Sequence, residues 1–143
     1  MSTGREPHLL SLVLDTHVLV WLAEGSPRLG VKARLVIAQT LRTGTVLVCA
    51  ISFWEIAALE RQGRLATSVP VRTFRGEALE MGIRERAVDG DLAIAAALLD
   101  WQHKDPADRL IAATTEALQG RLATADRDLL DWAGTRRSVD ARR

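Results

Sequence analysis

The sequence predicts a single α/β domain with a central, mostly parallel sheet of four to five strands flanked by helices. Its 143 residues match the size of one domain, and 48% of them are apolar, which is enough to bury a core. Short apolar runs alternate with amphipathic segments, a pattern typical of a parallel sheet covered by helices. Without an internal repeat or linker, residues 8–143 are expected to form the domain and residues 1–7 a flexible N-terminal tail.

The first predicted strand covers residues 9–14, the apolar run Leu-Leu-Ser-Leu-Val-Leu, and it ends at Asp15 and Thr16. A continuous apolar run of this length is typical of a strand buried on both faces. Ligands of open α/β sheets bind at the carboxyl ends of the strands. Asp15 is therefore expected to serve chemistry rather than packing.

Two helices and a strand follow. Residues 16–24 carry apolar side chains at helical spacing before a glycine, and residues 29–41 form a second amphipathic helix that Gly44 closes. The apolar run 45–50 is then predicted as the second strand.

The middle of the chain begins with a helix over residues 52–62, which Gly63 stops. A loop is expected over residues 64–70 and a helix over residues 71–80. Residues 83–88 alternate apolar and charged side chains, as a short edge strand does.

The C-terminal third contains two more helices, over residues 91–101 and 106–118. A short strand over residues 121–124 and a short helix over residues 126–132 follow. Residues 136–141 are either a last edge strand or a tail.

Composition argues against a highly charged, a disulfide-bonded or a membrane-spanning protein. The formal net charge is only +1, although all but two of the 19 basic residues are arginines, and most of these are expected to be solvated. Cys49 is the single cysteine, so no intramolecular disulfide forms, and a reducing, cytoplasmic location is expected. The apolar run over residues 9–14 is too short to span a bilayer, so no membrane association is expected.

Acidic residues stand just after predicted strands or at predicted helix starts, and each has an alternative role as a helix cap. Ser52 and Glu55 fit a capping box, in which the glutamate returns to the serine amide. A cap is also predicted at Asp105, before Pro106, and at Asp126. The acids concerned are Asp15, Glu55, Asp105, Asp108, Asp126 and Asp128.

Parallel strands end on one edge of a sheet, so these acids are expected to converge there. Like charges at close range raise one another's pKa unless a cation lies among them. A ligand set made only of oxygens favours Mg²⁺, with Mn²⁺ as the alternative, over zinc. Such a metal can orient a phosphodiester and activate water.

Several neighbours of these acids are candidates for supporting roles. Thr16 is expected to orient the Asp15 carboxylate or to cap the following helix. His17 and His103 each neighbour a candidate acid, and a positioning role is preferred to a general base for both. Asp105 and Asp128 are expected to support the metal ligands from outside.

Four motifs, in order along almost the whole chain, resemble the signatures of PIN domains, and above all the VapC toxins of type II toxin–antitoxin pairs. Their sequences are Leu-Asp-Thr-His-Val-Leu-Val-Trp over residues 14–21, Ser-Phe-Trp-Glu-Ile over 52–56, His-Lys-Asp-Pro-Ala-Asp-Arg-Leu-Ile-Ala-Ala-Thr over 103–114 and Leu-Ala-Thr-Ala-Asp over 122–126.

The resemblance implies a metal-dependent endoribonuclease that hydrolyses RNA phosphodiester bonds with Mg²⁺-activated water. Carried over to this sequence, the four acids of the family fall on Asp15, Glu55, Asp108 and Asp126, with Thr16 as the small polar neighbour. The chain departs from the usual pattern at Ala107 and Thr115, which leaves pocket shape and substrate choice open.

The resemblance also implies three partners: an RNA substrate, a cognate antitoxin protein and a second copy of the chain in a homodimer. Among the arginines, we expect Arg61, Arg64 and Arg109 to hold the RNA backbone.

Three alternatives remain open at this point. A catalytically inactive PIN-fold module would keep the fold only for protein binding. A phosphoacceptor receiver domain would need a lysine near the acids, and only Lys32 and Lys104 are available. A haloacid-dehalogenase-like phosphatase would need an acid where His17 stands.

Overall fold

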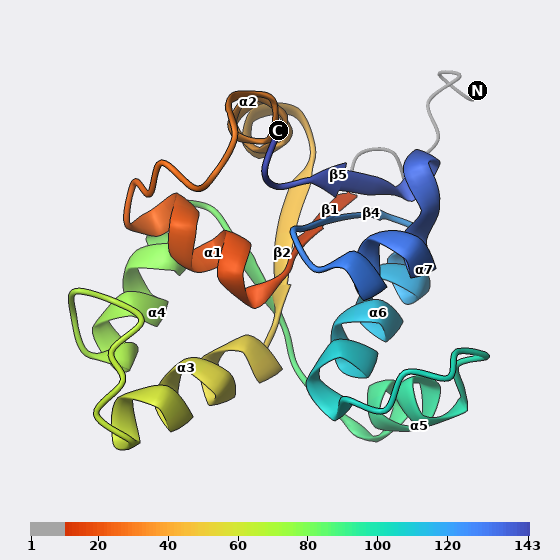
Figure 1. Cartoon of the computed structure of the whole chain (residues 1–143). Helices are drawn as coiled ribbons and strands as arrows, with labels where there is room; N and C mark the ends of the chain where they lie inside the picture. Colours follow the sequence, from red (N-terminus) through yellow and green to blue (C-terminus); the bar gives the residue numbers. More distant parts are fainter. Residues whose placement is uncertain (1–10) are drawn as a thin grey trace.

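The structure is a computed structural model that describes residues 11–143, so the expected tail and the first two residues of the expected first strand lie outside the described residues. Within this range, a sheet of five parallel strands has the order β3-β2-β1-β4-β5 (Figure 1). The predicted α/β class is confirmed, and every strand pairing is parallel. The strands are β1 (Ser11–Leu14), β2 (Thr45–Cys49), β3 (Arg84–Arg86), β4 (Arg121–Thr124) and β5 (Ser138–Asp140).

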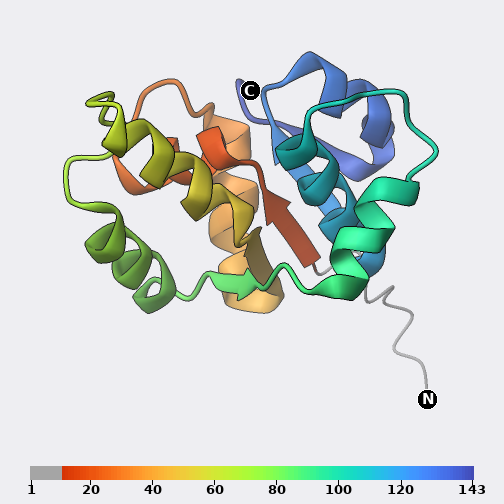
Figure 2. The ribbon, with the colours of Figure 1, turned by 90° about the horizontal axis from the view of Figure 1, so that it is seen from below.

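Helices cover both faces of the sheet. They are α1 (Thr16–Ala23), α2 (Val31–Thr43), α3 (Ile51–Arg61), α4 (Val71–Glu80), α5 (Gly90–Leu98), α6 (Pro106–Leu118) and α7 (Arg127–Arg137). Viewed from below, α3 and α4 lie on one side of β1, and α5, α6 and α7 lie on the other (Figure 2).

The alternation of side chains along β1 divides the core into two clusters, because successive residues of a strand point to opposite faces. Leu12 and Leu14 pack in one cluster with residues of α1, α2, α3 and α4. Val13 packs in the other cluster with residues of α5, α6 and α7. All three side chains are buried, as the predicted continuous apolar strand requires.

The position of β1 explains where the site forms. The chain continues from β1 to β2 on one side and later places β4 on the other side, so the strand order reverses at β1. Ligands of open α/β sheets bind at such a switch point, outside the carboxyl ends of the strands. Asp15 directly follows β1 and stands at this point.

Some predicted boundaries differ from the structure. The helix predicted over residues 91–101 ends at Leu98, because Leu99 adopts an extended backbone. The helix predicted over residues 126–132 runs on to Arg137 through a kink at Gly134, whose φ is 77°. Residues 138–140 form an edge strand rather than a tail.

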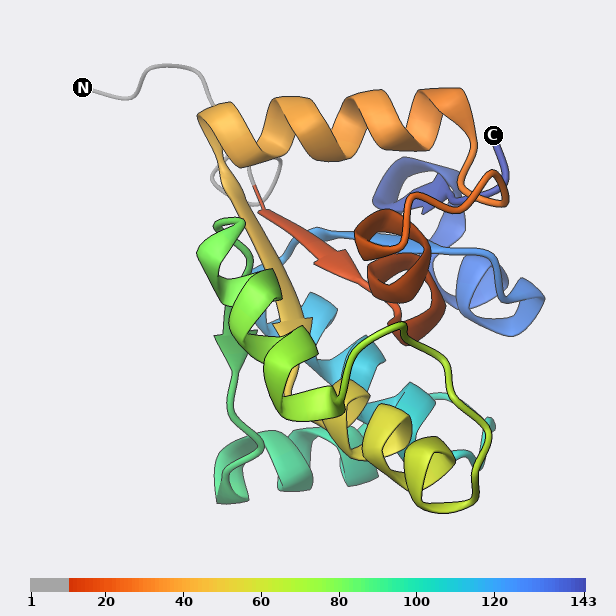
Figure 3. The same cartoon turned by 90° about the vertical axis from the view of Figure 1, so that its left-hand side faces the viewer.

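The C-terminal residues close the structure against the start of α2 (Figure 3). The Gly30 amide donates a hydrogen bond to the Ala141 carbonyl at 2.8 Å, and the Lys32 amide donates one to the Arg143 carbonyl at 2.8 Å. In the described part of the chain, none of the helices combines the length and apolar character needed to cross a membrane.

Candidate active site

Asp15 lies at the centre of the site and is nearly inaccessible, with 3% of its surface exposed. It is the N-cap of α1, because its Oδ1 accepts a hydrogen bond from the Thr16 amide at 2.7 Å. Its Oδ2 accepts a hydrogen bond from the Thr124 hydroxyl at 2.7 Å, which joins β1 to β4. Burial raises the pKa of Asp15, and these two hydrogen bonds oppose the rise.

Glu55 joins Asp15 through Thr16. The Thr16 hydroxyl donates a hydrogen bond to Glu55 Oε1 at 2.6 Å and lies 2.7 Å from the Ser52 hydroxyl. Burial raises the pKa of Glu55, and the nearby charge of Asp15 adds to the rise.

These contacts correct two cap predictions. The capping box is wrong, because the N-cap of α3 is Ala50 and the side chains of Ser52 and Glu55 face Thr16 instead. Thr16, which is distant in the sequence, therefore replaces the Ser52 amide as the hydrogen-bond partner of Glu55. Thr16 does not cap α1 either, since Asp15 occupies that position.

Asp108 is the third acid and lies in the first turn of α6. Its Oδ2 lies 2.7 Å from His103 Nε2. Burial raises the pKa of Asp108 to about 6, and the negative charges of Asp105 and Asp15 contribute. Asp105 is the N-cap of α6, as predicted, and accepts hydrogen bonds from the Ala107 and Asp108 amides.

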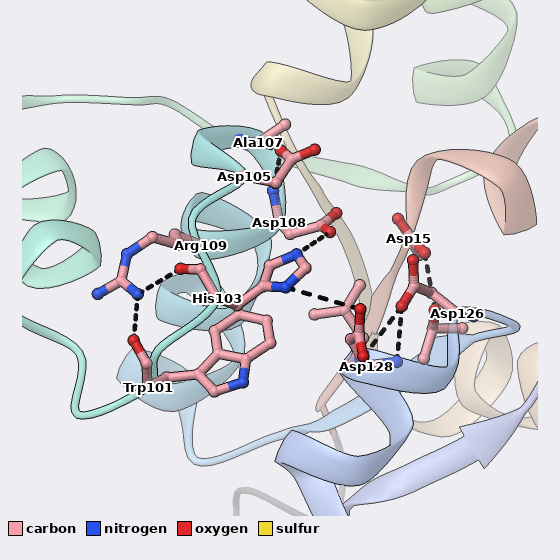
Figure 4. Close-up of polar contacts among 11 residues, drawn as sticks. Asp15, Trp101, His103, Asp105, Ala107, Asp108, Arg109, Asp126 and Asp128 are labelled. Carbon is pink, nitrogen blue, oxygen red and sulfur yellow. Dashed lines mark hydrogen bonds and ion pairs between the residues drawn. The ribbon is translucent and has the colours of Figure 1, made fainter.

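Asp126 is the N-cap of α7, so the helix-cap role predicted for it is confirmed. Its Oδ1 accepts hydrogen bonds from the Asp128 and Leu129 amides at 2.8 and 3.2 Å. The Asp126 amide donates to the hydroxyl of Thr124 at 3.0 Å, so Thr124 contacts two of the acids. In Figure 4 the carboxylates of Asp15, Asp108 and Asp126 turn toward the same space.

Two histidines lie beside these acids in different ways. His103 lies between Asp108 and Asp128, with Nδ1 3.7 Å from Asp128 Oδ2 (Figure 4). His17 makes an edge contact with Trp21, with ring centroids 6.2 Å apart, and its positive charge would lower the pKa of Asp15.

The three predicted RNA-contacting arginines lie in different environments. Arg61 and Arg64 are exposed at the end of α3 and after it. The guanidinium of Arg109 instead donates hydrogen bonds to main-chain carbonyls of α5 and of the loop before α6. The Arg109 side chain is therefore bound to its own fold.

The basic side chain that contacts these acids is a histidine, because His103 lies against Asp108. Within residues 11–143, no lysine or arginine forms an ion pair with Asp15, Glu55, Asp108 or Asp126. Over the same residues, no three histidine, cysteine, aspartate or glutamate side chains are already arranged to hold a metal ion. Within residues 11–143 the acids are thus gathered without a lysine or arginine partner, and they do not form a preformed metal site.

A pocket of about 480 Å³ lies beside the acids, and Thr16 and Glu55 are part of its lining. Its walls continue along α1 and α3 and include the apolar side chains of Trp21, Leu59 and Leu65.

Sequence reasoning missed Thr124 and Trp101 as parts of the site. Thr124 ends a predicted strand two residues before Asp126, so its place at the sheet edge could have suggested it. Trp101 stacks on the ring of His103 at 4.5 Å between centroids, and no sequence signal points to this contact.

Comparison with known proteins identifies the family of the chain. The PIN domain family matches residues 12–134. The chain is 33% identical over 122 residues to Ribonuclease VapC22 of Mycobacterium tuberculosis, a match that covers 85% of this chain and 91% of the relative. This excludes the receiver-domain and phosphatase alternatives. The chain belongs to the PIN domain family, and within it to the VapC type.

Proposed function

We propose that the protein is a metal-dependent endoribonuclease and the toxin of a type II toxin–antitoxin pair. The observation that carries this proposal is the gathering of Asp15, Glu55, Asp108 and Asp126 at the switch point of the sheet without a paired lysine or arginine in the described chain. The match to a relative named as a ribonuclease supports it.

The donor set fits a divalent cation such as Mg²⁺, with Mn²⁺ as the alternative, because it consists of carboxylate oxygens. Glu55, Asp108 and Asp126 each leave one oxygen for a ligand, whereas both oxygens of Asp15 already accept hydrogen bonds from the protein. Glu55 uses Oε1, Asp108 uses Oδ2 and Asp126 uses Oδ1 in the hydrogen bonds described above, and their second oxygens have no protein hydrogen bond within residues 11–143. Burial raises the pKa values of Glu55 and Asp108, and the negative charges of neighbouring acids add to the rise. A bound cation would relieve this repulsion.

Each residue has a proposed role in hydrolysis. Asp15, Asp108, Glu55 and Asp126 hold the cation, which supplies Lewis acidity toward the phosphodiester and toward water when bound. Thr16 orients Glu55 through its hydroxyl, and Thr124 orients Asp15.

RNA is proposed to approach over the exposed end of α3. Arg61 and Arg64 lie there, and Leu65, the next residue, lines the pocket beside Glu55. We assign Arg109 to the protein fold instead of to RNA, because its donors are already engaged with carbonyls. Unpaired RNA is favoured over duplex, since splayed bases can enter a shallow crevice.

The surface beside the acids supports the proposal of an antitoxin partner. A segment of a cognate antitoxin protein is proposed to fill the apolar pocket next to Glu55, where it would exclude RNA. Homodimerisation and a cytoplasmic location are also part of the proposal.

RNA cleavage tests the enzymatic function directly. Purified protein is incubated with a pool of small RNAs and Mg²⁺ or Mn²⁺, next to Asp15→Asn protein and a sample with chelator. We expect cleavage only by the wild-type protein with metal. An intact pool in every sample would favour the inactive protein-binding module, and equal cleavage by Asp15→Asn would show that the activity does not need this acid.

Growth of host cells tests the toxin role. Expression of the chain alone is expected to arrest growth, and Asp15→Asn is expected to relieve the arrest. Normal growth while intact, folded protein accumulates would contradict the toxin assignment.

A further inference from the structure

The loop between α5 and α6, residues 99–105, contacts the carboxylate of Asp108 through the side chain of His103. The ring Nε2 lies 2.7 Å from Asp108 Oδ2. This leaves Asp108 Oδ1 without a protein hydrogen bond within residues 11–143 and fixes the direction in which it points. The orientation of Asp108 therefore depends on where the loop holds His103.

The ring of His103 is held by an aromatic stack. Trp101 lies nearly parallel to it, with an interplanar angle of 19° and centroids 4.5 Å apart. Trp101 in turn contacts Trp132 of α7 at 5.8 Å between centroids. The far ring nitrogen, Nδ1, faces the exposed carboxylate of Asp128 at 3.7 Å (Figure 4).

The backbone of the same loop is held by Arg109, the residue next to Asp108. Arg109 Nη1 donates to the carbonyls of Trp101 at 2.6 Å and His103 at 2.8 Å. Only arginine offers several donors in a rigid planar fork, which suits several carbonyls at once.

Arg109 also closes the end of α5. Its Nε donates to the Ala96 carbonyl at 2.9 Å, and Nη2 donates to the carbonyls of Ala97 at 3.2 Å and Leu99 at 2.9 Å. Carbonyls at a helix C-terminus lack partners within the helix, so this side chain supplies them. One guanidinium thus fastens both the start of the loop and the residues that carry His103.

We propose that His103 and Arg109 are positioning residues for the metal ligand Asp108: His103 directs the carboxylate, and Arg109 acts through His103 by fixing the loop. The proposal rests on the proposed function, because it concerns the affinity of the same acids for a divalent cation. Hydrogen-bond partners of metal ligands commonly change metal affinity by about 10–100-fold when removed.

The first test measures Mn²⁺ binding to the full chain by titration calorimetry without RNA. His103→Ala is expected to raise the Kd for Mn²⁺ by about 10–100-fold. His103→Gln is expected to recover most of this loss, because its amide nitrogen can donate to Asp108. The Tm without metal is measured in parallel, and we expect similar values for both variants.

The second test asks whether Arg109 acts through His103. Arg109→Lys keeps the charge but loses the planar fork, so it is expected to raise the Kd for Mn²⁺ as well. The double variant, His103→Ala with Arg109→Lys, is expected to bind Mn²⁺ no more weakly than His103→Ala alone. The effects of two substitutions do not add when one residue acts through the other. Additive losses would overturn the proposed dependence on His103.

Arg75→Ala is the matched control, because it removes an arginine that forms a two-point contact with Glu85 on α4 and β3. Its Kd for Mn²⁺ is expected to equal that of the wild-type protein. If His103→Ala also binds Mn²⁺ like the wild-type protein, the positioning role is overturned while the metal-dependent function stands. If the wild-type protein neither binds Mn²⁺ nor cleaves RNA with any divalent cation, both proposals fail.

Discussion

The Thr124 hydroxyl donates a hydrogen bond of 2.7 Å to Asp15 Oδ2 across 109 positions of the sequence. Thr124 is the last residue of β4, and Asp15 directly follows the adjacent parallel strand β1. Both residues are almost fully buried. The same hydroxyl oxygen accepts a hydrogen bond from the Asp126 amide. The register of β1 on β4 therefore sets the direction of the innermost acid.

Replacing Thr124 by valine is expected to destabilise the fold, because Val keeps the shape but leaves Asp15 Oδ2 buried without a donor. An unsatisfied buried acceptor costs about 1–3 kcal/mol, and urea denaturation without metal should give a decrease of this size. Thr124→Ser retains the hydroxyl and serves as the control. Equal stability of the valine and wild-type proteins would mean that this hydrogen bond has no net effect.

The stability of the protein without metal is expected to fall as pH rises toward 6. Asp108 has a pKa of about 6 when folded against an ordinary value of 3.8, so the folded chain binds more protons between these values. A group of this kind contributes stability below its unfolded pKa, and the contribution is lost as pH rises through the folded pKa.

Asp108→Asn removes this titration. As pH rises from about 4 to about 6, the free energy of unfolding of the wild-type protein should therefore fall by about 1–3 kcal/mol relative to that of the variant. Urea denaturation in chelator at several pH values measures the difference. Parallel pH profiles of the two proteins would show that Asp108 does not titrate there. Asp15 and Glu55, whose pKa values are also raised, are present in both proteins.

Divalent cation is expected to raise the Tm of the wild-type protein. A ligand that binds only the folded state stabilises it by about 2.7 kcal/mol at a concentration 100 times its Kd. Differential scanning fluorimetry with Mn²⁺ checks this, with Asp15→Asn expected to lose the shift. Asp89→Asn is the control and is expected to keep the shift, because Asn can still accept the hydrogen bond from the Leu92 amide at the N-cap of α5.

Gly30→Ala is expected to destabilise the protein strongly, because a Cβ at this position would overlap the backbone of Arg143. Backbone cannot give way as a flexible side chain can, so the contact between α2 and the C-terminal residues would be lost. Gly76→Ala is the opposite case: a Cβ at this position in α4 meets nothing within 4 Å, and about 0.5–1 kcal/mol of stabilisation is expected. Thermal unfolding of the two variants tests this contrast, which equal Tm values would contradict.

The element order and the neighbourhood of the acids could be predicted because both depend on local patterns. The apolar run before Asp15 has strand length, and Asp105-Pro106 begins a helix as its residue types indicate. Parallel strands bring their carboxyl ends to one edge whatever their sequence, so acids at strand ends meet there.

The hydrogen-bond partners within the site could not be predicted in the same way. Ser52 and Glu55 match a capping box as a sequence, yet both turn to Thr16 once α1 packs against α3. Arg109 was predicted to contact RNA phosphates. The course of the chain after α5 instead brings main-chain carbonyls to its guanidinium, which no sequence pattern indicates.

The sequence by itself therefore determined the α/β class and the acids that follow the strands, because periodicity, helix caps and strand ends are local properties. Its four motifs carried the resemblance to the PIN domain family. The tertiary structure alone decided which neighbours orient each acid: Thr124 for Asp15, Thr16 for Glu55 and His103 for Asp108. Two of these contacts join residues far apart in the chain, and the third depends on how a loop is held. Their formation follows from the packing of strands and helices, which no local pattern specifies.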